Sequence, residues 1–151
     1  MCIYSFGSSS FHELALGATE RSFVSKPTRI GLGKYLNLGD HFKVQQVTGG
    51  RHHIVILVTD SAEAKSCLLT CGSNEKQQLG REGSWSKLQP VIFDSHLITH
   101  VACGYHHNTV LTGAGQVFAW GCNEFGQLGL NVDSESAAKP TLVKALGNLC
   151  V

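Results

Sequence analysis

The chain has 151 residues, of which 42% are apolar and only 15% charged, and it contains 17 Gly and 6 Cys. A net charge of +1 excludes the strong positive field that is typical of nucleic-acid binders and of proteins that bind anionic membranes. Neither a signal peptide nor a membrane span of about 18 apolar residues is expected from any segment. The composition favours short strands joined by tight turns, with reduced, buried Cys thiols rather than disulfides.

The first predicted element is a half repeat over residues 1–40. Gly7 follows a short apolar strand, and Leu14 lies seven positions after it. A buried Leu at that place anchors the intervening loop back onto the sheet. Pro27 is expected to open the next strand, because the missing N–H of Pro costs no ladder hydrogen bond at a strand's first residue.

The first full repeat is predicted over residues 41–95. It contains a Gly-x-x-His turn, Gly50 to His53, that is followed by an apolar strand. A second Gly, Gly72, ends the third strand, and Leu79 again lies seven positions later. We interpret these residues as structural repeat positions, with the imidazole in a hydrogen bond between strands.

A polar loop follows Leu79 and carries two candidate contact residues. Trp85 lies in the segment Arg81-Glu82-Gly83-Ser84-Trp85-Ser86-Lys87. An aromatic side chain in a polar loop is a candidate partner contact, and we group Arg81 with it. The alternative is that the Trp85 ring folds back over the sheet.

The second full repeat is predicted over residues 96–151 and repeats the same signals. Gly104 and His107 match the Gly-x-x-His turn, and Gly121 and Leu128 match the pair that ends the third strand. Gly-Ala-Gly at 113–115 marks the hairpin between the second and third strands. Pro140 is expected to open the fourth strand.

The three copies align into one repeat array over residues 1–151. The last two share Gly-x-Asn-Glu-x-x-Gln-Leu-Gly, and the spacings are 65 and 49 residues between the Gly7-type positions and 54 between Gly50 and Gly104. A unit near 50 residues with four short strands matches one blade of a propeller. The predicted fold class is therefore all-β, a partial β-propeller of about two and a half four-stranded antiparallel blades. Phe6, Cys71 and Trp120 occupy one equivalent position, for which we expect core packing.

Neither a cofactor, a metal nor a catalytic constellation is predicted. Cys103, His106 and His107 include two metal-ligand types, but the first full repeat has Gly49 in place of Cys103 and no fourth ligand is near. The nucleophile, phosphate-loop and zinc-protease motifs are missing from the sequence. We expect no enzyme activity from these residues.

The segment from Cys103 to Leu111, together with the segment from Gly115 to Gly129, resembles the repeat of the regulator of chromosome condensation family. Residues 44–93 and 3–30 match less strongly, so that nearly the whole chain is covered. The resemblance implies a seven-bladed propeller, of which this chain is similar to the first third, as a fragment, a shortened isoform or an incomplete gene model. Some members begin in the same register and complete their N-terminal half blade with strands from the C-terminus.

The resemblance implies a protein partner, and two functions stay open. The leading interpretation is a protein–protein interaction scaffold. The alternative is a guanine-nucleotide exchange factor for a small GTPase, or a truncated remnant of one, because the founding member acts on the GTPase Ran and docks on chromatin. Nucleic acid and membrane are not expected as partners. A cytoplasmic or nuclear location is expected, as is self-association of a chain expressed alone, since open blades leave bare sheet edges.

Overall fold

The computed structural model describes residues 2–17, 22–32, 42–93 and 97–147, and its regular structure is almost entirely β-strand. The elements are β1 (Ile3–Ser8), β2 (Phe23–Ile30), β3 (Phe42–Gly49), β4 (His53–Asp60), β5 (Lys65–Gly72), β6 (Gln89–Val91), β7 (Ile98–Cys103), β8 (His107–Thr112), β9 (Val117–Cys122), β10 (Ser136–Leu142) and the 3₁₀ helix η2 (Lys144–Leu146). Among the described residues, no helix is long and apolar enough to cross a membrane.

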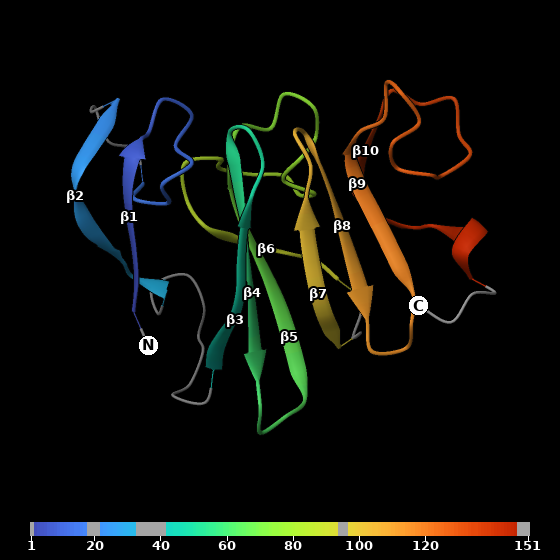
Figure 1. Cartoon of the computed structure of the whole chain (residues 1–151), viewed down its shortest axis with the longest axis horizontal. Helices are drawn as coiled ribbons and strands as arrows, with labels where there is room; N and C mark the ends of the chain where they lie inside the picture. Colours follow the sequence, from blue (N-terminus) through green and yellow to red (C-terminus); the bar gives the residue numbers. More distant parts are fainter. Residues whose placement is uncertain (1, 18–21, 33–41, 94–96, 148–151) are drawn as a thin grey trace.

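The strands form three antiparallel sheets that stand side by side in chain order (Figure 1). We call β1–β2 the half blade, β3–β4–β5–β6 the central blade and β7–β8–β9–β10 the terminal blade. The predicted fold, a partial propeller of two four-stranded blades and a half, is confirmed. The boundaries predicted at residues 40/41 and 95/96 lie outside the described residues.

The core lies between the sheets, because each blade packs face to face on the next. Side chains of a strand point alternately to its two faces. In β4 the buried Val55 and Leu57 therefore pack with Trp120 of the terminal blade. The intervening Ile56 packs instead in the cluster that contains Ile30 of the half blade. Burial on both faces explains why this strand is a continuous apolar run.

Gly121 and Gly104 are constrained for two different reasons. The φ of Gly121 is +103°, and a Cβ there would lie 2.4 Å from the carbonyl oxygen of His106, so a side chain is strained and obstructed. The φ of Gly104 lies outside the left-handed region. Its constraint is steric, because a Cβ would lie 2.1 Å from Cε1 of His107. The Gly three residues before each repeat His therefore makes room for the imidazole.

We expected Pro27 and Pro140 to open their strands, but all three Pro residues of the chain lie inside strands. Pro27 and Pro140 lie within β2 and β10, in stretches where the pairing register with the neighbouring strand shifts. Pro90 is the second residue of β6. Each of these strands is the outermost of its sheet, where one edge is unpaired and a missing N–H is tolerated. The prediction was wrong about the strand starts and right about the strands.

Phe6 is 63% exposed, so the prediction that it packs in a core was wrong. Its equivalents Cys71 and Trp120 are fully buried because the loop of the preceding repeat covers them. The Sγ of Cys71 lies 3.6 Å from the carbonyl oxygen of His12, and the indole of Trp120 donates to the carbonyl of Gln78 at 3.1 Å. Within the described residues, no loop of this kind lies over the Phe6 ring, which accounts for its exposure.

Candidate protein-interaction surface

The turns after β3 and β7 and the long connections after β1, β5 and β9 gather at one end of the sheets, at the top of Figure 1. The connections are held by repeated hydrogen bonds. Oδ1 of Asn74 accepts from the backbone N–H of Leu79 at 2.9 Å, and Oδ1 of Asn123 accepts from Leu128 at 3.1 Å. Both Leu side chains are buried, whereas that of Leu14 is half-buried. The loops are therefore pinned, and their tips form a defined surface.

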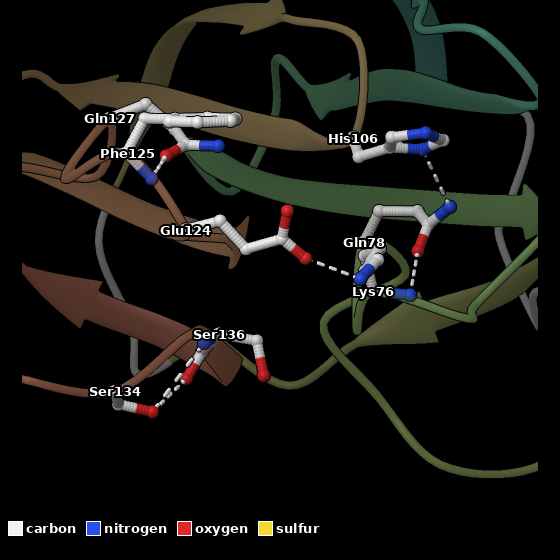
Figure 2. A network of polar contacts seen from close by, with 8 residues as sticks. All are labelled: Lys76, Gln78, His106, Glu124, Phe125, Gln127, Ser134 and Ser136. Atoms are coloured by element: carbon white, nitrogen blue, oxygen red, sulfur yellow. Dashed lines mark hydrogen bonds and ion pairs between the residues drawn. The ribbon is translucent and has the colours of Figure 1, made fainter.

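Side-chain amides brace the same loops from within (Figure 2). Oε1 of Gln78 accepts from the backbone N–H of Lys76, and Oε1 of Gln127 accepts from that of Phe125, both at 2.8 Å. Two contacts cross between blades: Lys76 pairs with Glu124, and the amide of Gln78 meets Nδ1 of His106 at 3.4 Å. Neighbouring loops are thus tied to each other as well as to their own sheet.

The two repeat His residues differ in environment. His53 is buried, and its Nε2 lies 2.7 Å from Oδ1 of Asn108 on the terminal blade, so the hydrogen bond joins strands of two blades. Burial, as the main cause, lowers the pKa of His53. His107 is half-buried, and its side chain makes no hydrogen bond within the described residues. Among those residues, no group of three His, Cys, Asp or Glu side chains is arranged to hold a metal ion.

Arg81 is not a surface contact residue, contrary to our expectation. Its side chain is 8% exposed because the guanidinium lies inside the loop. Nη2 donates to the carbonyls of Thr70 and Lys87 at 2.7 and 3.1 Å, and Nη1 donates to Oε1 of Gln89 at 2.8 Å. Nε donates to the hydroxyl of Thr70, and Nη1 also reaches the carbonyls of the loop. Arg81 therefore shapes the loop that presents Trp85.

Trp85 lies at the surface, with 52% of the residue exposed. Its ring meets that of His12, on the half blade, edge to face, with 6.4 Å between the centroids. The residue before His12, Phe11, stacks on His52 of the central blade, with the ring centroids 3.9 Å apart. The Trp85 side chain thus leans toward the neighbouring repeat while half of it faces solvent.

The series of ring contacts continues onto the terminal blade. The guanidinium of Arg51 lies over the ring of Tyr105, 4.9 Å from its centroid, and the Tyr105 and His106 rings meet edge to face at 4.8 Å. Tyr105 is 60% exposed. We call the following residues, which come from all three repeats, the aromatic belt: Phe11, His12, Arg51, His52, Trp85, Tyr105 and His106.

The belt carries positive charge near its centre. Arg51 makes no ion pair with a carboxylate in the described part of the chain. Desolvation is the first cause that lowers the pKa of His106, and the nearby side chains of Arg51, His52 and Lys76 lower it further, against an opposing contribution from Glu75. Aromatic rings together with Arg are the side chains enriched at the centres of protein interfaces. The arrangement has the side-chain chemistry of a surface that can bind a protein.

Sequence reasoning singled out Trp85 in this belt and missed Tyr105, Arg51 and Phe11. Tyr105 and Arg51 occupy one repeat position, at the tip of the Gly-x-x-His turn. A variable position between fixed Gly and His residues was the available signal. Phe11 lay in the half repeat, where the match to the other copies was poorest.

The chain matches the model of the regulator of chromosome condensation (RCC1) repeat at residues 2–57, 66–111 and 114–151. It belongs to the RCC1-repeat family. The RCC1-repeat chain is 34% identical to the mouse probable E3 ubiquitin-protein ligase HERC4 over 93% of its own length and 17% of the ligase. It is 31% identical to the mouse secretion-regulating guanine nucleotide exchange factor, over 95% of itself and 29% of that protein. Enzymes are thus named among its relatives.

The fold of the RCC1-repeat chain is also found in solved structures. Prp20p from Saccharomyces cerevisiae, studied for its binding to Gsp1p and histones, aligns with a TM-score of 0.79 at 21% identity, over 97% of this chain and 35% of Prp20p. At that identity the likeness shows the fold alone. The chain spans about a third of this solved propeller and less of the two curated relatives above.

Proposed function

We propose that this chain is a protein–protein interaction scaffold that binds a partner through the aromatic belt. The observation that carries the proposal is the exposure of Trp85 and Tyr105 on hydrogen-bonded loops of adjacent blades, with the guanidinium of Arg51 stacked over Tyr105 and without a carboxylate partner among the described residues. Large, partly exposed rings on pinned loops lose little conformational entropy on binding. In this proposal the chain performs no chemistry of its own and acts in the cytoplasm, the nucleus or both.

Capture of binding proteins from a cell extract by the tagged full chain tests the proposal. We expect Trp85→Ala and Tyr105→Ala each to reduce capture of the same protein at least several-fold. Each should change the free energy of unfolding by no more than about 1 kcal/mol. Phe23→Ala is the matched control, because Phe23 is 65% exposed but lies on β2, outside the belt. If no captured protein depends on the belt while Phe23→Ala behaves like the belt variants, the proposed surface is wrong.

A second candidate function is guanine-nucleotide exchange on a small GTPase, or a remnant of it. The match to the secretion-regulating exchange factor over 95% of this chain favours it. The test is release of a fluorescent guanine nucleotide from purified small GTPases. Acceleration by the chain supports exchange activity, and unchanged release across the GTPases tested leaves the scaffold as the function.

A further inference from the structure

The half repeat carries His12 at a loop position where the other two copies have Gln77 and Gly126. All three residues adopt a left-handed backbone, with φ of +61°, +63° and +71° in chain order. This conformation suits Gly, and other residues are uncommon in it. Gly126 is therefore the residue that this backbone favours, and the presence of an imidazole at His12 needs another explanation.

The hydrogen bonds of the loop, rather than the His12 side chain, fix this backbone. Oε2 of Glu13 accepts from the N–H of Phe11 at 2.8 Å, in the same way as the Gln amides brace the two later loops. The carbonyl of His12 accepts from the N–H of Ala15 at 3.3 Å and from Sγ of Cys71 at 3.6 Å. The loop is thus braced internally and bound to the central blade.

Hydrogen bonding does not account for the imidazole of His12 either. Among the described residues, Nδ1 of His12 is buried without a hydrogen-bond partner, which is unfavourable for a polar atom. The ring instead makes the edge-to-face contact with Trp85, with 77° between the two ring planes. Edge-to-face is one of the preferred arrangements of aromatic rings. The contact with the indole is therefore the favourable interaction that distinguishes His12 from a Gly.

The indole of Trp85 in turn depends on His12 for its orientation. The carbonyl of Trp85 accepts from the N–H of Gly72 at 2.9 Å, so the backbone is held at the end of β5. Within the described residues, the one ring–ring contact of the indole is with His12. Because half of the residue faces solvent, the removal of that ring would leave the side chain with more freedom.

We propose that His12 is a positioning residue whose ring holds the Trp85 indole in one orientation on the aromatic belt. An indole that is ordered before a partner arrives loses less conformational entropy on binding. The half repeat thereby contributes to the contact surface of the next repeat. The effect of His12 on binding rests on the proposed function, whereas its effect on the indole does not.

Acrylamide quenching of tryptophan fluorescence in the full chain tests the proposal without a partner. The chain has two Trp residues and Trp120 is fully buried, so the quenchable emission comes from Trp85. His12→Gly should increase this quenching, because the indole loses its neighbouring ring. His12→Phe keeps a ring without imidazole nitrogens and should leave the quenching unchanged. Trp85→Ala should abolish the quenchable emission and so confirms its source.

Gln77→Gly is the matched control, since Gln77 has the same backbone conformation and an exposed side chain. It should raise the melting temperature by a few degrees through the backbone alone and leave the quenching of Trp85 unchanged. Unchanged quenching in His12→Gly would overturn the proposal. An increase in His12→Phe or in Gln77→Gly as large as that in His12→Gly would overturn it as well.

Capture from a cell extract then reads the effect of His12 on binding. His12→Gly should reduce capture of a Trp85-dependent protein several-fold, whereas His12→Phe and Gln77→Gly should not. Undiminished capture by a His12→Gly chain with increased quenching would overturn the role in binding. If no captured protein depends on Trp85, the proposed function fails, and the quenching result still decides whether His12 positions the indole.

Discussion

At His53, burial and hydrogen bonding act in opposite directions on one imidazole. Desolvation lowers its pKa, the bond to Asn108 raises it, and the neighbouring His106, His107 and His52 lower it. The pKa of His106 and of His107 is lowered as well, with desolvation as the first cause in both. The buried environment of the joint between the two full blades therefore favours the neutral form of the His53 imidazole.

We expect the chain to lose stability as the pH falls from about 7 to 5. The unfolded His53 titrates near the ordinary value of 6.5 and the folded one lower, so below 6.5 the unfolded state binds more protons. The stabilisation is present above pH 6.5 and is lost as the pH falls through the folded pKa. The measurement is the urea midpoint as a function of pH. His53→Gln should flatten this dependence, and an unchanged slope in that variant would place the effect elsewhere.

Leu128 and Leu14 provide a test of the repeat alignment at the level of single side chains. Leu128 is 2% exposed and packs with Ala119 and Val143, so Leu128→Ala should cost about 2–5 kcal/mol of unfolding free energy. Leu14 is half-buried, so Leu14→Ala should cost less, under about 2 kcal/mol. Equilibrium urea unfolding measures both. The reverse order of costs would mean that the alignment is out of register.

Between elements, the side-chain amide of Gln46 on β3 makes the two hydrogen bonds to Val101 of β7 that a backbone peptide group would make in a sheet. Its Nε2 donates to the carbonyl of Val101 at 2.7 Å, and its Oε1 accepts from the N–H of Val101 at 3.0 Å. The neighbouring Gln45 makes a single such bond, from Nε2 to the carbonyl of Thr99 at 2.9 Å, in an exposed setting. Two edge strands that belong to different sheets, β3 and β7, are thereby joined by side-chain hydrogen bonds rather than by a backbone ladder.

Gln46→Ala should loosen the central blade from the terminal blade. It leaves both polar groups of the buried Val101 without a partner, at a cost of about 1–3 kcal/mol. Amide hydrogen exchange at Val101 should accelerate accordingly, and the urea midpoint should fall. Gln45→Ala, the control one residue away, should stay within about 0.5 kcal/mol. Equal effects of the two substitutions would argue against a special role for the paired bond.

The strands were predictable from sequence because Gly turns and apolar runs recur with the blade period. The contacts that one repeat makes with its neighbour could not be predicted from the sequence. Trp120 and Phe6 occupy the same repeat position, but their burial depends on whether another loop covers them. Arg81 looked like a contact residue in a polar loop, and its burial depends on six hydrogen bonds that sequence spacing does not reveal. Tyr105 joined the candidate surface through a contact with Arg51 across a blade joint.

At the scale of the whole molecule, the half blade leaves an open sheet edge. In the full blades the strands equivalent to β1 pair on both sides, whereas β1 pairs only with β2 among the strands that the structure describes. Tyr4 and Phe6 on this strand are 56% and 63% exposed. An unpaired edge with exposed apolar side chains is a template for pairing with another chain.

We expect the purified 151-residue chain to self-associate in a concentration-dependent way on gel filtration. Phe6→Lys should reduce association, because a charge on the edge strand opposes pairing. Phe125→Lys is the control, since Phe125 is 89% exposed but lies in a loop away from the edge. A sharp monomer peak with a cooperative melt at every concentration would contradict the prediction.

The joints also set an order of events during protein synthesis. Each full sheet is made of strands consecutive in sequence, but the bonds of Trp120 to Gln78 and of His53 to Asn108 span 42 and 55 residues. The central blade ends at Val91, and Trp120 lies 29 residues (120 − 91) further along the chain, which the ribosome covers in roughly 1.5–6 s at about 5–20 residues per second. During that interval the backbone pairing of the central blade can be complete while Gln78 and Gly80 still lack their partners from the terminal blade. Slow translation between residues 93 and 120 would therefore prolong the exposure of a finished sheet to chaperones and to neighbouring nascent chains.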